Sequence, residues 1–120
     1  MLTSRFDHYS WVGIYVVEGV DLVLAAWQGA AATEHVRIPV GQGICGAAAA
    51  TGRTEIVDDV NEDNRYLACF TSTRSEIVVP IVRGGVVLGE IDIDSDEHAA
   101  FAMDDQVFLE QVALELAPLL

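Results

Sequence analysis

Lysine is absent from this chain, and its six basic residues are all arginine. Against 19 acidic residues they leave a formal net charge of −13 at pH 7. A surface with this excess of negative charge repels phosphate backbones and anionic lipids. We therefore expect neither nucleic acid nor a membrane as a partner, and we attribute most of the carboxylates to solubility.

Long apolar runs and targeting features are also missing. No segment approaches the roughly 20 apolar residues that a membrane-spanning helix needs, and the N-terminal MLTSRFDHYS lacks the basic-then-apolar order of a signal peptide. A cytoplasmic location is the default expectation. The 120 residues, 52% of them hydrophobic, suffice for one domain (residues 1–120) with a core of its own.

Cysteine is scarce, with only Cys45 and Cys69 in the chain. Disulfides are rare in a reducing cytosol, which argues against a structural bridge. The chain has no CxxC pair and its three histidines are scattered, so the spacings typical of zinc sites are missing and we expect no metal. Two interpretations remain, two inert core thiols or a redox pair.

The pattern of apolar residues predicts an α+β fold with a mainly antiparallel sheet. Hairpins are expected over 11–28 and 76–94. A short helix is expected over 44–51, with Gly52 as its C-terminal stop, and an amphipathic helix over 103–120. Short strands are expected at VRIPV and EIV, and DDVNEDNRY has the composition of a long surface loop. The proline within EIVVPIV indicates an edge or a bulge.

The segment EIDID carries the most informative local pattern. Side chains alternate along a strand, so Asp92 and Asp94 share one face, which Glu90 extends, and the isoleucines occupy the other. If the acidic face is open to water, the carboxylates form an ordinary solvated surface and indicate no function. Spacing alone favours that interpretation. If a loop covers it, the carboxylates share a confined space, and one of them keeps its proton to high pH and can act as a general acid.

Glu76 joins this face in only one of two registers of the second hairpin. A three-residue turn places Glu76 opposite Asp92, and a two-residue turn at Gly84-Gly85 places it opposite Ile93. Sequence alone does not decide between them.

The thiols and two aromatic residues each have two interpretations. Cys45 lies at a predicted helix start, where thiolates are stabilised, but cysteine is also a common core residue, and that second reading is favoured. For Cys69, in a loop rich in hydroxyl groups, a reactive and an inert role are evenly balanced.

Trp11 and Tyr15 share a strand face, which usually indicates core packing, although such a pair could also hold a thioether methyl group.

Several segments in order, WVGIY, HVRIPVGQGICGAAA, YLAC, SEIVVPI and GEIDIDS, resemble the free methionine-R-sulfoxide reductases, which are small enzymes with a GAF fold. The resemblance runs from about residue 9 to the C-terminus. It implies a GAF-like antiparallel sheet with helices packed on one face and a loop-covered pocket on the other. It implies no cofactor and no metal.

Carried over by position, the family's catalytic cysteine falls on Cys69 and the cysteine of its GxCG motif on Cys45. Its active-site acids fall on Glu76, Asp92 and Asp94, which favours the register that places Glu76 with the aspartates. Its aromatic wall falls on Trp11 and Tyr15, with Glu76 and Asp94 also binding the substrate.

The implied reaction is reduction of free L-methionine-R-sulfoxide to methionine. Cys69 attacks the sulfoxide sulfur while Glu76 or Asp94 protonates the oxygen. The resulting sulfenic acid condenses with a second thiol, and a thioredoxin-like protein reduces the disulfide.

Two departures from the family matter. Many members carry a third cysteine at the position of His35, so either Cys45 resolves the sulfenic acid, the external reductant attacks it directly, or turnover is lost. The sequence also shows no N-terminal helical segment of the usual kind, so we expect part of a wall or of a homodimer contact to be lacking. The alternatives to the enzyme are a non-catalytic GAF module that binds a small ligand or senses redox state, and a dimeric scaffold using the terminal helix.

Overall fold

The computed structural model describes residues 9–29, 36–63 and 73–120. Cys69 and His35 lie outside the described residues, as does the end of the surface loop expected at DDVNEDNRY. The roles predicted for these two residues therefore stay predictions.

Six strands form one antiparallel sheet in the order β3-β2-β1-β6-β5-β4. Both predicted hairpins are confirmed, because β1 pairs with β2 and β5 pairs with β6, and the two hairpins join through β1 and β6. The strands are β1 (Trp11–Glu18), β2 (Asp21–Gly29), β3 (Arg37–Pro39), β4 (Glu55–Val57), β5 (Ser75–Arg83) and β6 (Val86–Ser95).

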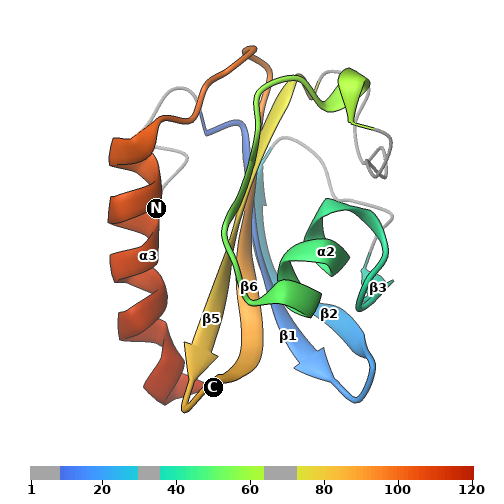
Figure 1. Ribbon diagram of the computed structural model, residues 1–120, viewed down its shortest axis with the longest axis vertical. Coiled ribbons are helices and arrows are strands. Elements are labelled where there is room, and N and C mark those ends of the chain that lie inside the picture. Colours follow the sequence, from blue (N-terminus) through green and yellow to red (C-terminus); the bar gives the residue numbers. More distant parts are fainter. Residues whose placement is uncertain (1–8, 30–35, 64–72) are drawn as a thin grey trace.

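In the described part of the chain, two α-helices stand on opposite sides of this sheet (Figure 1). The short helix α2 (Gly43–Thr51) ends at Gly52, whose φ of 68° is left-handed, so the predicted glycine stop is confirmed. The long helix α3 (Met103–Leu116) continues into the 3-10 turn η2 (Ala117–Leu119), and a second such turn, η1 (Val60–Glu62), follows β4. None of the described helices is long and apolar enough to cross a membrane.

The face of the sheet under α3 is apolar. Ile77 and Val79 of β5 and Ile91 and Ile93 of β6 are almost completely buried there, packed with Leu109 of α3. Burying one such side chain stabilises the fold by about 1.5–3 kcal/mol. Apolar packing on this face therefore holds α3 in place.

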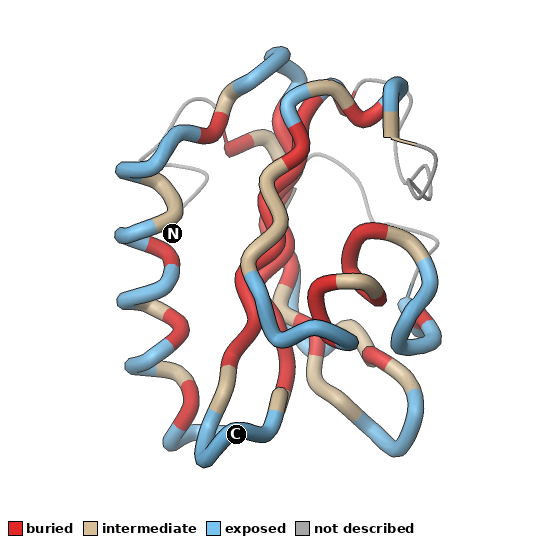
Figure 2. The backbone as a smooth tube through the Cα atoms, viewed as in Figure 1, coloured by how far each residue is buried: buried red, intermediate tan, exposed pale blue. Residues whose placement is uncertain are grey.

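The opposite face is covered by α2 and η1. Its buried apolar members come from segments far apart in the chain, among them Tyr15, Leu22, Ile38, Ile44, Val60 and Val78. In Figure 2 the central strands are buried along most of their length. The strand residues on this second face, unlike those under α3, include acids.

Pro80 has no backbone N–H group, and it lies in a part of β5 that β4 does not pair with. β4 pairs with β5 only from Glu76 to Val78, and the register of β5 with β6 becomes irregular between Ile81 and Val82. The predicted edge or bulge at the proline is confirmed.

Candidate active site

Four carboxylic acids are buried on the face covered by α2. Glu90, Asp92 and Asp94 of β6 have exposed fractions of 0%, 1% and 2%, and Glu76 of β5 has 4%. The solvated acidic face that spacing alone favoured is therefore wrong. Strand alternation was interpreted correctly, but packing of α2 and the segments around it excludes water from the carboxylates.

Both registers proposed for Glu76 are also wrong, because it pairs with Asp94. The turn at Gly84-Gly85 does have two residues, with φ values of 59° and 80°, and Arg83 pairs with Val86. The irregularity beyond Ile81 then adds one residue to β6, which shifts every later pair by one. Because of this extra residue, Glu76 lies on the same face as the aspartates, as the family resemblance implies.

Cys45 projects from the first turn of α2 toward this acidic face. Its Sγ lies 3.9 Å from Oε2 of Glu76, and Sγ and one carboxylate oxygen each from Glu76 and Asp92 lie within 4.8 Å of one another. Gly46 allows this placement, since a β-carbon there would stand 2.8 Å from the amide nitrogen of Gly41. The helix can therefore pack directly on the segment before it.

Two opposing effects act on the Cys45 thiol. A helix N-terminus stabilises a thiolate and lowers the pKa of the thiol. Burial raises the pKa of Cys45 well above its ordinary value, and the negative charges of Asp92 and Glu76 raise it further. Burial and like charge outweigh the helix, so Cys45 is a protonated thiol at neutral pH.

The buried acids hold protons more tightly than surface carboxylates do. Burial, reinforced by the charge of Asp92, raises the pKa of Glu90 and the pKa of Asp94 well above their ordinary values. Burial also raises the pKa of Asp92, against hydrogen bonds with Glu76 and Cys45 that lower it. A carboxyl group that stays neutral at physiological pH can donate a proton to a reacting oxygen.

These acids also have unused hydrogen-bonding capacity. Both carboxyl oxygens of Glu90 and of Asp94, and Oδ1 of Asp92, are buried without a hydrogen-bond partner among the described residues. Leaving buried polar atoms unsatisfied costs about 1–3 kcal/mol each. Such atoms are suited to binding a ligand that brings its own donors.

Trp11 and Tyr15 form a wall beside the acids. Across the β1–β6 pairing, Trp11 stands opposite Asp94 and Tyr15 stands opposite Glu90, and both aromatic side chains are buried. The shared face predicted for the two residues is confirmed. The structure thus brings Cys45, Glu76, Asp92, Asp94, Trp11 and Tyr15 together.

Sequence reasoning missed the two glycines that seat the indole. A β-carbon on Gly13 would overlap Cη2 and Cζ3 of Trp11, and one on Gly29 would overlap Cδ1. The indole therefore lies flat against the sheet over both glycines. Glycine inside a strand, which marks a close approach of other atoms, was the signal available in the sequence.

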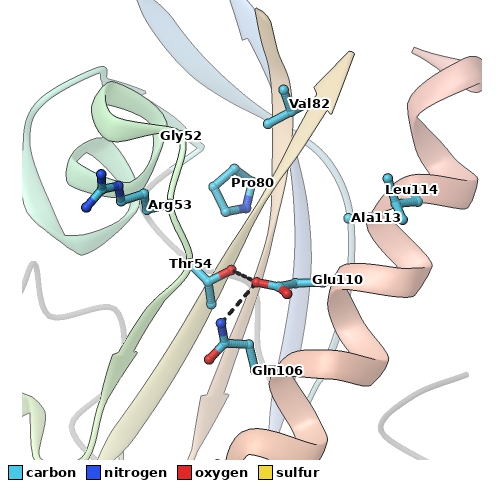
Figure 3. Close-up of a pocket in the computed structure, with 9 residues that line it drawn as sticks. All are labelled: Gly52, Arg53, Thr54, Pro80, Val82, Gln106, Glu110, Ala113 and Leu114. Carbon is cyan, nitrogen blue, oxygen red and sulfur yellow. Dashed lines mark hydrogen bonds between the residues drawn. The ribbon is translucent and has the colours of Figure 1, made fainter. Parts of the chain in front are cut away.

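A separate hollow of about 590 Å³ lies along β5, between α3 and the segment that follows α2 (Figure 3). There Thr54 donates a 2.7 Å hydrogen bond to Glu110, and Gln106 donates one of 3.0 Å to the same oxygen. None of the candidate site residues that the structure describes lines this hollow, and its described lining has no thiol. The chemistry therefore belongs to the acidic face.

Comparison with known proteins relates the chain to one enzyme family. The family model of the GAF domain matches residues 3–119. Free methionine-R-sulfoxide reductase of Escherichia coli (strain K12) is 37% identical over 120 residues, which are 100% of this chain and 72% of that protein.

Two solved structures are similar as well. The type II free methionine-R-sulfoxide reductase from Thermoplasma acidophilum is 45% identical, with a TM-score of 0.95 over 98% of this chain and 83% of that one. The free methionine-R-sulfoxide reductase from Neisseria meningitidis, in complex with its substrate, is 40% identical, with a TM-score of 0.90 over 98% of this chain and 70% of that one.

Proposed function

Because the chain belongs to the GAF domain family and, within it, to the free methionine-R-sulfoxide reductases, we propose that it reduces free L-methionine-R-sulfoxide to methionine. One observation carries the proposal beyond the resemblance. A protonated thiol, buried carboxyl groups with raised pKa values and an aromatic wall meet on one face of the sheet.

The reduction transfers one oxygen atom from substrate sulfur to enzyme sulfur. The sulfur of Cys69 attacks the sulfoxide sulfur while a neutral carboxyl group, Asp94 or Glu76, protonates the oxygen. The sulfoxide is reduced to the thioether, and the Cys69 thiol is oxidised to a sulfenic acid. The raised pKa of Asp94 supports its role as the donor, because a donor must still hold its proton at working pH.

Recognition of the free amino acid uses the same buried acids. Their unused oxygens can accept hydrogen bonds from the substrate's α-ammonium group, which a residue inside a peptide lacks. The indole of Trp11 and the ring of Tyr15 offer apolar surface to the methyl group. A free amino acid therefore fits this site better than a peptide-bound residue does.

Regeneration needs a second thiol, and Cys45 is the candidate in this chain. The sulfenic acid on Cys69 condenses with the Cys45 thiol, which forms a disulfide and releases water. A thioredoxin-like dithiol then reduces that disulfide by exchange. The family's third cysteine is replaced by His35, so the proposal assigns the resolving step to Cys45 alone.

A coupled assay tests the activity and both cysteines. We expect NADPH oxidation through thioredoxin with free L-methionine-R-sulfoxide, and much slower turnover with the S epimer and with the N-acetylated substrate. Cys69→Ser should abolish turnover. Cys45→Ser should still allow a single turnover, detected as one equivalent of methionine and a sulfenic acid, but not multiple turnover.

A remote substitution provides the control. Glu110→Gln lies on α3, beside the separate hollow, and should leave the kinetic constants unchanged. If the parent chain makes no methionine, the reductase assignment is refuted and a ligand-binding GAF module is left. If turnover survives Cys69→Ser, the assigned nucleophile is wrong.

A further inference from the structure

Three atoms that metals bind well converge on the covered face of the sheet. They are Sγ of Cys45 from α2, a carboxylate oxygen of Glu76 from β5 and a carboxylate oxygen of Asp92 from β6. All three lie within 4.8 Å of one another, and all three residues are buried. The sequence spacing hid this group, because its members are brought together only by the fold.

The separation of the thiol and Glu76 fits two ligands of one ion. Sγ of Cys45 lies 3.9 Å from Oε2 of Glu76, which is long for a strong hydrogen bond. A Zn–S bond of about 2.3 Å and a Zn–O bond of about 2.1 Å at the tetrahedral angle place sulfur and oxygen roughly 3.6 Å apart. A small rotation of either side chain would close the difference.

An independent observation marks this place as one that lacks a ligand. Oδ1 of Asp92 is buried and has no hydrogen-bond partner in the described part of the chain. Both oxygens of the neighbouring Asp94 are in the same condition. The chain has no lysine, and among the described residues the salt bridge Arg37–Asp21 and the contact between His98 and Asp59 both lie elsewhere. A cation would supply the missing partner.

We propose that Cys45, Glu76 and Asp92 form a binding site for a borderline or soft divalent cation such as Zn²⁺ or Cd²⁺. One thiolate and two carboxylates suit these ions, whereas Mg²⁺ and Ca²⁺ prefer oxygen ligands alone. Three protein ligands leave a fourth tetrahedral position for water.

Occupation of this site has a consequence that rests on the proposed function. The ion would hold Cys45 as a thiolate ligand and tie up two acids of the substrate site. Bound metal would therefore inhibit the reductase reversibly, and substrate and metal would compete for the same space. Chelation would restore turnover.

Cadmium binding tests the site without any need for turnover. A titration of the reduced protein with CdCl₂, after removal of the reductant, should give a thiolate-to-cadmium charge-transfer band in the ultraviolet that saturates at one equivalent. The band should persist in Cys69→Ser and disappear in Cys45→Ser. Asp92→Asn should raise the dissociation constant by roughly tenfold or more, and the surface variant Asp21→Asn should not change it.

Two outcomes overturn the proposal. A band that survives Cys45→Ser, or one that needs Cys69, places the metal elsewhere. Equal affinity in Asp92→Asn and Asp21→Asn would show that the buried carboxylate is not a ligand. If Cys45→Ser fails to fold, the comparison of Asp92→Asn with the parent still tests whether the metal binds at this site. The titration does not depend on turnover, so a failure of the reductase assay leaves it unaffected.

Discussion

The indole of Trp11 lies flat on Gly13, two residues further along the same strand, so closely that a β-carbon on Gly13 would overlap its six-membered ring. Gly13 stands opposite Asp92 in the β1–β6 pairing. The missing side chain therefore fixes the plane of the aromatic wall beside the central acid of the site.

Replacing Gly13 by alanine should move this wall. The added methyl group must push the indole off the strand, and overpacking of this kind costs about 1–3 kcal/mol of stability. Because the wall is proposed to contact the substrate's methyl group, we expect KM for free methionine sulfoxide to rise several-fold with a smaller change in kcat. Steady-state kinetics on the coupled assay measures both constants.

Fluorescence separates movement of the wall from general loosening of the fold. Trp27 is the other tryptophan and is partly exposed, so Trp27→Phe makes emission report on Trp11 alone. In that background Gly13→Ala should shift the emission to longer wavelength. Gly52→Ala, which strains the left-handed end of α2 and has no contact with the indole within 4 Å of the added carbon, should not. Unchanged emission and KM in Gly13→Ala would contradict the proposed cradle.

Removing the charge of Glu90 should stabilise the protein. Burial raises the pKa of Glu90, so the folded state binds a proton that the unfolded chain releases above about pH 4. Stability is therefore lost as pH rises from the unfolded pKa toward the folded one. Glu90→Gln keeps the shape without the charge, and we expect it to raise the free energy of unfolding at pH 8 by on the order of 1 kcal/mol.

Urea denaturation at several pH values measures this effect. The gain from Glu90→Gln should be small near pH 4, where the parent acid is already neutral in both states, and should grow toward pH 8. Glu97→Gln, on an exposed residue of the segment after β6, gives the control, with no such trend. A gain that is equal at both ends of the range would refute the role of ionisation.

The sequence predicted most of this fold because local signals agree with the tertiary structure. Gly84-Gly85 defines one hairpin turn, Gly52 ends α2, and alternation in EIDID separates the acids from the isoleucines. The register of Glu76 could not be predicted from the sequence, because it depends on one extra residue in β6, next to the pair formed by Ile81 and Gly89. Tertiary packing, and not the turn sequence, determines that such a bulge forms. Hairpin turns fix register only when no bulge follows.

The state of the acids could not be predicted for a different reason. Whether Asp92 and Asp94 are solvated depends on where α2 packs, and helix placement is a tertiary property. Local spacing also argued against metal ligands, although Cys45 and Asp92 come together in the folded chain. The residue types were visible in the sequence, but their proximity was not.

The contact between α3 and the segment before β4 should affect stability without affecting catalysis. Thr54 donates a hydrogen bond to Glu110 at a partly exposed position on the face opposite the acids. Thr54→Val removes that bond, and we expect a loss of about 0.5–1.5 kcal/mol in the free energy of unfolding. kcat and KM should match those of the parent at a temperature where both are folded. A change in KM would link the two faces of the sheet.

The alkaline limit of activity should identify the proton donor. A carboxylic acid donates only while it is neutral, so turnover falls as pH rises through its folded pKa. Burial and the charge of Asp92 raise the pKa of Asp94, which favours Asp94 over Glu76 as the group responsible.

Asp94→Asn should lower kcat by roughly 100-fold or more and should abolish the alkaline decline. Glu76→Gln should weaken substrate binding yet keep the decline, and a pH profile of kcat for both variants measures this. If the decline instead vanishes in Glu76→Gln and persists in Asp94→Asn, the donor is Glu76, and the pairing of these two residues across β5 and β6 serves to hold Asp94 near the substrate's ammonium group.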